Sequence, residues 1–156
     1  MSSFIATGNA GNRAAEPIEN NGFWPAIDPA EFRETNRIDS TVTPPRVQDA
    51  LLTAMATTNR VLRHWQARQI AEGYSRADDV PASDWQPPGT YPALYKRAVF
   101  AEAHARILER YRDYDATAST RDRGDLNEYT GESYRRDAAW AISEIEGRPH
   151  STVELI

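Results

Sequence analysis

The sequence predicts an all-α protein, a small helical bundle of about four helices with an extended N-terminal arm and a strand-like C-terminal tail. Two observations carry this prediction: apolar residues recur at helical spacing through the long segments, and Pro, Gly and short polar residues stand at their ends. Only the last residues alternate apolar and polar side chains as a strand does. We therefore expect a helical domain at 28–147, preceded by an arm at 1–27 and followed by a tail at 148–156.

The composition narrows the class of protein. The chain has no cysteine, which excludes disulfides, thiolate nucleophiles and Cys-ligated zinc and fits synthesis inside a cell. No apolar run reaches the roughly 18 residues that span a bilayer, and no signal peptide is expected. The net charge is -5, whereas proteins that hold DNA through phosphate contacts are usually basic. Every basic residue except Lys96 is arginine, which GC-rich coding favours and which also suits contacts between subunits.

Residues 1–27 are rich in Gly, Asn, Ala, Ser and Pro and show neither a helical nor a strand period. This predicts an arm without structure of its own. Phe23 and Trp24 are the exception, because two large aromatic side chains form an apolar anchor within the arm. The anchor is expected to contact either the subunit's own domain or a neighbouring chain.

Two helices are expected in the first half of the domain. The first is short, with Asp28 as its cap, Pro29 at its first position and Glu31 at the capping-box position. The second is longer and lies between Thr43, its expected cap, and Gly73, which closes it. The apolar stripe of this second helix consists of Val47, Leu51, Ala54, Thr58, Leu62, Trp65 and Gln69.

A proline-rich connector leads to the third expected helix, from 94 to about 111. Most of its circumference is apolar, so we expect it at the centre of the bundle, with neighbours on two sides. Its many alanines would allow those neighbours to approach closely. The remaining polar stripe is narrow and consists of Glu102, Arg106, Glu109 and Asp113.

The last part of the domain is expected to hold a loop and a fourth helix. The stretch TASTRDRGDLN at 117–127 is charged and poor in apolar residues, which predicts a loop. A helix should follow from about 128 to 146, and Trp140 falls outside its apolar face, beside Arg136. Trp140 is therefore either covered by a wide apolar stripe or makes a contact beyond its own subunit. The apolar face itself consists of Tyr134, Ala138, Ala141, Ile142 and Ile145.

The chain ends on EGRPHSTVELI, which is typical of a helix end followed by a short strand. Gly147 closes the helix, and Pro149 imposes an extended backbone. Val153, Leu155 and Ile156 then alternate as strand residues do, with no other strand in the sequence to pair with. This run either pairs with another polypeptide by β-augmentation or covers a groove on its own helices.

No sequence pattern predicts catalysis, a metal site or a cofactor. His64, His104 and His150 lie far apart, and none has a second ligand at metal-site spacing. The sequence holds no Gly-rich phosphate loop and no nucleophile elbow. Paired carboxylates carry no sequence signature, so they alone neither support nor exclude a hydrolase. We expect a protein that is not an enzyme and that acts by binding partners.

Segments that together cover nearly the whole chain carry a resemblance to a known family. In order from 23 to 156 they are FWPAIDP, VTPPRVQDALLTAMATTNRVL, IAEGYSRADDVPA, YKRAV, ERYRDYDATA, WAISEIEGRP and the closing apolar run. They resemble the GpL family, the head completion proteins of Peduovirus-type contractile-tailed phages. The resemblance implies a helical neck adaptor, with neither cofactor nor catalytic activity, whose copies form a homo-oligomeric ring of about twelve beneath the portal protein. Such a ring joins after DNA packaging, stabilises the filled head and offers a docking surface to the tail terminator or another neck protein.

The resemblance also implies a location and a relation to DNA. The protein would be made in the cytoplasm of the bacterial host and would end in the virion, at the head–tail neck, with no membrane involved. Double-stranded DNA would pass through its channel without sequence-specific binding, and a net charge of -5 suits a lumen that repels phosphate. The alternative is a helical chaperone or regulator that binds one partner and is not retained in the virion.

Two sets of contact residues follow from these expectations. By analogy with related adaptors, the C-terminal tail is expected to reach the portal and pair with it. Phe23, Trp24 and Trp140 are expected to contact their own subunit or a neighbour. The portal-binding residues are Ser151, Thr152, Val153, Glu154, Leu155 and Ile156.

The predicted loop at 117–127 has two competing placements, one lining the channel and one facing the tail. Its mixed charges do not decide between them. A related hypothesis is that the protein seals the DNA directly. It would place basic residues of this loop, or Arg135 and Arg136, in the lumen. The charged residues of the loop are Arg121, Asp122, Arg123 and Asp125.

Overall fold

The computed structural model describes residues 16–115 and 121–150, and the side chains of 16–110 and 131–150. These residues form no strand and only one isolated bridge, which confirms the predicted all-α bundle. The elements are α1 (Pro29–Asn36), α2 (Pro44–Ala71), the short 3-10 helix η1 (Ala77–Asp79), α3 (Thr90–Asp115) and α4 (Arg121–Ile145).

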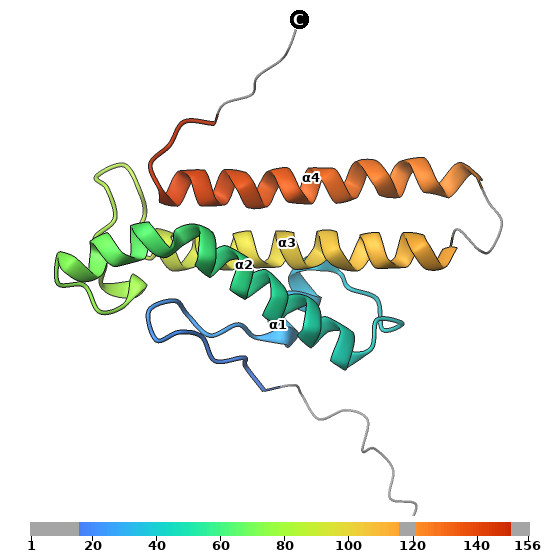
Figure 1. The fold of residues 1–156 in the computed structure, drawn as a ribbon, viewed down its shortest axis with the longest axis horizontal. Coiled ribbons are helices and arrows are strands. Elements are labelled where there is room, and N and C mark those ends of the chain that lie inside the picture. The colour runs from blue at the N-terminus through green and yellow to red at the C-terminus, as the bar shows by residue number, and fades with distance from the viewer. Residues whose placement is uncertain (1–15, 116–120, 151–156) are drawn as a thin grey trace, which may run out of the picture.

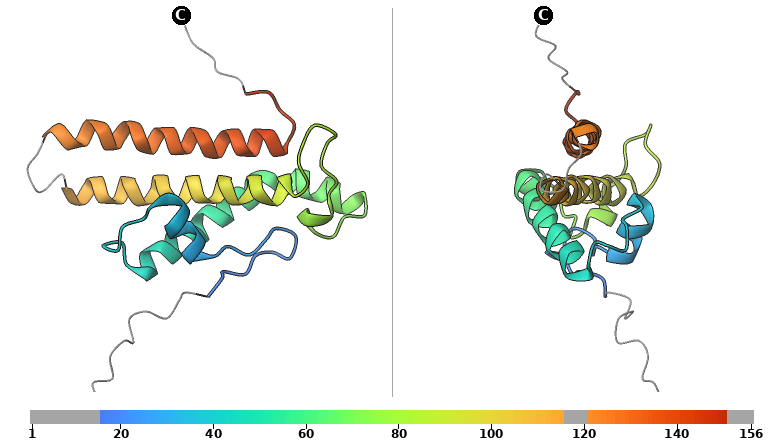
Figure 2. Two further views of the ribbon diagram at one scale, coloured as in Figure 1. Left: turned by 180° about the vertical axis from the view of Figure 1, so that it is seen from behind. Right: turned by 90° about the vertical axis from the view of Figure 1, so that its right-hand side faces the viewer.

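Helix α3 is the centre of the bundle, as its apolar circumference predicts. It contacts α4 along its length, and it also contacts α2, α1 and η1. Figure 1 shows α4 on one side of α3, and α1 and α2 on the other. The end-on view in Figure 2 places α2 and α1 on two different flanks of α3. Small side chains allow this close packing, because Ala98, Ala103 and Ala105 are fully buried.

The first two helices begin much as their sequences predict. The Asp28 carboxylate accepts a hydrogen bond from the amide of Ala30 at 2.8 Å, which confirms the predicted cap of α1. Glu31 accepts a hydrogen bond from Lys96 at 2.9 Å instead of closing a capping box. Thr43 occupies the cap position of α2, but its side chain makes no capping hydrogen bond, so that part of the prediction is wrong.

Helix α4 begins earlier than predicted. The prediction of a loop through 127 is wrong, because 121–127 already belong to α4, while 117–120 lie outside the described residues. Extending a helix costs much less free energy than nucleating one. Once the amphipathic part of α4 has formed, the helix can therefore extend toward its N-terminus through the polar residues and Gly124, despite their low helix propensity. The candidate loop residues therefore lie in the first turns of α4; they are Arg121, Asp122, Arg123 and Asp125.

The segment before α1 forms part of the core. Ile18 and Ile27 exchange backbone hydrogen bonds of 2.7 and 3.0 Å, which closes a loop around the aromatic anchor. Trp24 is 3% exposed, and its ring stacks on Trp65 at 5.5 Å and on Tyr95 at 4.5 Å between centroids. Residues 16–27 are thus packed against the helices of their own subunit.

A closed set of hydrogen bonds holds this segment to α2 and α3. Asn20 donates to the hydroxyl of Tyr95 at 2.8 Å, Tyr95 donates to Asn59 at 2.7 Å, and Asn59 donates back to Asn20 at 2.9 Å. Burial raises the pKa of Tyr95 to about 12, so its hydroxyl keeps the proton that it donates. Each of the three side chains is both donor and acceptor, which avoids the cost of an unpaired buried polar group.

Truncating the stacked tryptophan should destabilise the whole subunit. Trp24→Ala should lower the free energy of unfolding by about 3–5 kcal/mol, because it leaves a cavity between Trp65 and Tyr95. Urea unfolding followed by circular dichroism measures this change. Trp85→Ala is the matched control, since Trp85 is 75% exposed, and it should change stability by no more than about 0.5 kcal/mol. Equal effects at the two positions would contradict the central role of the anchor.

Candidate interaction surfaces

Helix α4 ends in a Schellman motif that determines where the tail leaves the bundle. Gly147 has a φ of 68°, and its amide donates to the carbonyl of Glu144 at 3.2 Å. The amide of Arg148 donates to the carbonyl of Ser143 at 2.8 Å. Pro149 follows and prevents the helix from continuing. The prediction that Gly147 ends the last helix is confirmed.

Trp140 lies on the outer side of α4, next to the start of the tail. It is 36% exposed, so a wide apolar stripe does not cover it. The guanidinium of Arg136 lies 5.1 Å from its ring centroid, within range of a cation–π interaction, and the His150 ring lies 5.4 Å away. The chain beyond 150 therefore departs beside an exposed tryptophan. The predicted portal-binding residues at 151–156 lie outside the described residues.

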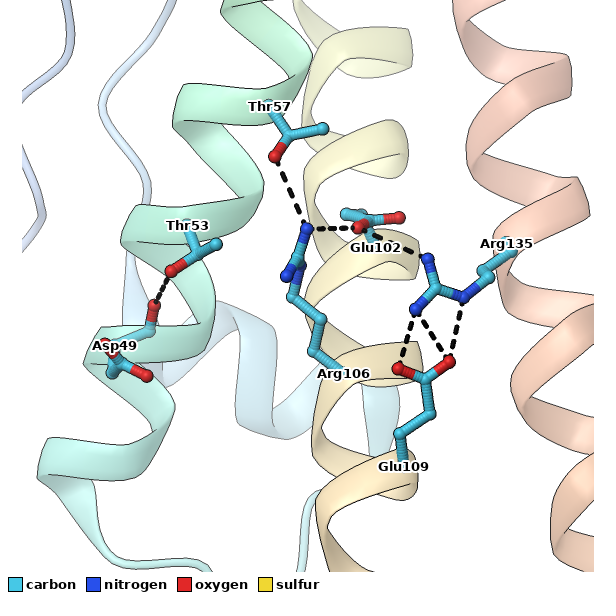
Figure 3. Close-up of polar contacts among 7 residues, drawn as sticks. All are labelled: Asp49, Thr53, Thr57, Glu102, Arg106, Glu109 and Arg135. Atoms are coloured by element: carbon cyan, nitrogen blue, oxygen red, sulfur yellow. Dashed lines mark hydrogen bonds and ion pairs between the residues drawn. The ribbon is translucent and has the colours of Figure 1, made fainter.

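A network of charged side chains joins α2, α3 and α4 (Figure 3). Glu102 of α3 forms ion pairs with Arg106 at 2.8 Å and with Arg135 of α4 at 3.7 Å. Arg106 also reaches the hydroxyl of Thr57 on α2 at 3.4 Å. Glu109 binds the same Arg135 through hydrogen bonds of 2.6 to 2.9 Å. The polar stripe predicted on the third helix thus fixes how its two neighbours pack against it.

The two adjacent arginines of α4 make different contacts. Arg135 points to α3, and its hydrogen bonds with Glu109 raise its pKa above the ordinary range for arginine. Arg136 lies over Trp140. Sequence reasoning did not connect Arg135 with the acids of α3. The signal was present, because Glu102 and Glu109 are seven residues apart on one face and need cations from a neighbouring helix.

His104 lies where α1, α3 and α4 meet. Its ring lies 4.0 Å from the Tyr134 ring between centroids, and its Nδ1 is 3.4 Å from the side-chain oxygen of Asn36. Burial lowers the pKa of His104, since desolvation disfavours the charged ring. This side chain therefore packs as a neutral ring near neutral pH.

Within the described residues, no group of three or more His, Asp or Glu side chains is placed to hold a metal ion. In the same part of the chain, no helix combines the length and hydrophobicity needed to cross a membrane. What the geometry does offer is a rigid helical subunit with an exposed tryptophan at the base of its C-terminal tail, a combination suited to binding other proteins.

Comparison with known proteins places this helical binding protein in a family. The family model described as phage head completion protein (GPL) matches residues 18–156. The chain is 39% identical, over 139 residues, to the head completion/stabilization protein of Escherichia phage P2, covering 89% of this chain and 82% of the relative. It is 28% identical, over 146 residues, to the probable head completion/stabilization protein of Haemophilus phage HP1, covering 89% of this chain and 91% of the relative. No solved structure matches the chain significantly.

The chain belongs to the phage head completion protein (GPL) family, as its sequence segments predicted. The match includes the tail, which begins beside Trp140, and the anchor segment around Trp24. The structure places the sequence-predicted contact residues in separate environments: the aromatic anchor is in the core of its own subunit, and only Trp140 remains on the surface.

Neutralising the shared acid of the network should loosen the packing of α3 and α4. Glu102 is 13% exposed and is paired with two arginines, so Glu102→Gln should cost about 1.5–3 kcal/mol of unfolding free energy. Asp78→Asn is the control, because the side chains of its pair with Arg76 are 65% and 54% exposed. The control should cost about 0.5 kcal/mol or less. Chemical denaturation compares the two, and similar losses would argue against the network as a packing determinant.

Acidification should destabilise the subunit through His104. Because the folded pKa lies below that of the unfolded chain, the unfolded state binds more protons once the pH falls below about 6.5. Stability should therefore be highest above that pH and fall until the lowered folded pKa is passed. His104→Gln should reduce this slope, whereas His64→Gln, at an exposed position of α2, should not. Urea midpoints across a pH series measure the difference, and an unchanged slope in His104→Gln would contradict the assignment.

Proposed function

We propose that this chain is a structural component of the phage virion, a head completion protein that forms a ring beneath the portal and stabilises the DNA-filled head. The observation that carries the proposal is family membership over 18–156, together with relatives whose names state head completion or stabilization. The ring would offer the next neck or tail protein a docking surface. No step of this role requires a cofactor or catalysis.

The fold supports such a role because a ring subunit must be rigid and must present two different side faces. Buried apolar contacts from the four α-helices and the anchor segment supply the rigidity. A closed ring uses heterologous contacts, so the two side faces of a subunit are unlike each other. The flanks of α3 satisfy this condition, since one carries α2 and the other carries α1 (Figure 2). About twelve copies would complete the ring.

The portal contact is assigned to the tail at 151–156. The Schellman motif at Gly147 gives the tail a fixed origin, and Pro149 keeps its first residues extended. Trp140, with Arg136 and His150, provides an exposed aromatic surface at that origin. A partner that pairs with the alternating apolar residues of the tail would bury this tryptophan as well.

Double-stranded DNA would pass through the ring without sequence-specific contacts. The net charge of -5 disfavours adhesion of phosphate. Arg135, one of the two arginines considered for a DNA-sealing role, is held by Glu109 and Glu102 of its own subunit. The first turns of α4, around Arg121 and Arg123, keep their two candidate positions, lining the channel or facing the tail.

Removing the tail should abolish attachment without unfolding the subunit. A chain lacking 152–156 should keep its circular dichroism spectrum and urea midpoint, because the described core ends at Ile145. It should fail to sediment with DNA-filled heads in a complementation assay, whereas a chain lacking 1–10 should still attach.

Two outcomes would count against the proposal. If the shortened chain still completes heads, the tail does not carry the portal contact. If the full-length chain is missing from purified virions, a chaperone or regulator is the better description of the protein.

A further inference from the structure

The outer surface of α2 carries an unusual set of exposed apolar side chains. Leu52, Val61 and Ile70 are 47%, 39% and 50% exposed, and they are three of the five large apolar residues exposed in the described part of the chain. By helical spacing, Leu52 and Ile70 share one edge of the helix and Val61 lies on the other. These side chains border the exposed stripe of α2 on both edges and would be covered if another chain packed on that stripe.

Between these edges, the same surface is basic and built from small residues. Arg60, Arg63 and Arg68 are exposed, and none of them forms an ion pair within the residues that the structure describes. Arginine is enriched at protein interfaces, and small side chains let another surface approach closely. DNA phosphates would bind the arginines but would leave the apolar edges exposed. The small residues of this stripe are Ala56, Ala67 and Ala71.

The opposite flank of the subunit is concave. A groove of about 380 Å³ lies between α1, α3 and α4. Phe100 and Ala101 supply apolar lining, Glu31 and Asp137 lie on its two sides, and Lys96 and Arg97 also line it. Asp137 is half-buried and has no polar partner among the described residues. Asp137 is therefore available to pair with a cation from another chain.

The groove and the basic surface lie on opposite sides of α3. Tyr95 and Arg106 of α3 form hydrogen bonds to α2, whereas Lys96 and Phe100 contact α1 and line the groove. The views agree, since α2 lies in front of α3 in Figure 1 and α1 lies in front after a half turn (Figure 2). The subunit thus has one convex and one concave flank.

The charges of the two flanks are complementary. Glu34 and Glu144 follow Glu31 and Asp137 by three and seven residues, which places them on the same faces of α1 and α4 as those two acids. Lys96 in the groove is paired with Glu31, which leaves Asp137 and Arg97 as the charged lining residues without an ion pair among the described residues. The arginines of α2 can therefore pair with Asp137 if two subunits pack side by side.

We propose that the outer surface of α2 docks into the groove between α1, α3 and α4 of a second copy, and that this contact is the side contact of the ring. The inference rests on the proposed function and specifies the surfaces that build the ring. The contact is heterologous, so it repeats around the ring without a change of register. In it, Arg60 or Arg63 would approach Asp137 of the adjacent copy, and Ala67 would allow the two helical surfaces to pack closely.

Cysteine cross-linking tests this arrangement cleanly because the chain has no cysteine of its own. Ala67→Cys and Ala93→Cys place exposed thiols on α2 and on the groove lining. In DNA-filled heads treated with a short bis-maleimide, the double variant should give a ladder of dimers, trimers and higher oligomers. Each single variant should remain monomeric, since a head-to-tail contact joins unlike surfaces.

The controls separate the failure of this contact from the failure of the proposed function. Ala67→Cys with Ala139→Cys, an exposed position of α4, should give no ladder. A dimer from Ala67→Cys alone would overturn the proposal in favour of a symmetric α2–α2 contact. If the chain is present in heads but the first pair gives no ladder, only this contact is wrong. If the chain is absent from heads, the proposed function is wrong. Cross-linking of the same double variant in a concentrated solution of the purified protein then tests whether the contact forms.

A charge exchange gives an independent test. Arg63→Asp and Asp137→Arg should each reduce incorporation into heads about tenfold, and the two changes together should restore it. Circular dichroism spectra should be unchanged, because both side chains lie on the surface or in an open groove. Additive losses in the double variant would overturn the pairing. Arg60→Gln and Arg63→Gln could instead abolish binding to a short DNA duplex while the cross-linked ladder still forms. That result would assign these arginines to DNA.

Discussion

A helix that is apolar around most of its circumference must be covered on more than one side, and α3 imposes this constraint on the whole subunit. Tyr95, Ala98 and Val99 of this helix have no exposed surface. Helix α4 covers one side of α3, and α2 and α1 cover the others. Trp24 stacks between Trp65 of α2 and Tyr95 of α3 and so covers a further part of the α3 surface. Burial of this apolar surface is the main source of stability, and the other elements are arranged around it.

Polar groups decide how these neighbours are aligned. Asn20, Asn59 and Tyr95 satisfy one another in the core, and the acids of α3 bind arginines of α3 and α4. The net stability from such groups is modest, but an unpaired buried group would be costly, so one arrangement of the helices is preferred. The result is a subunit with unlike flanks, one formed by the outer surface of α2 and the other by the groove between α1, α3 and α4.

The elements that the sequence predicted well have strong local signals. Asp28 caps α1 and Gly147 ends α4, because these signals depend on a few neighbouring residues. The sequence does not predict the start of α4, because the polar first turns of this helix have no apolar periodicity of their own. They form because the helix extends from the amphipathic part that follows. The arm was judged from composition, yet 16–27 packs on the core. Composition does not reveal that Asn20 finds partners far away in the sequence.

The sequence alone determined the all-α class, the central position of α3, the end of α4 and the family, because each depends on local periodicity or on residue order. The tertiary structure decided which side chains meet. It buried Trp24 within its own subunit, left Trp140 exposed, joined Arg135 to the acids of α3 and placed α2 opposite the groove. These outcomes depend on contacts between residues far apart in the chain. Such contacts form only when the helices are packed against one another.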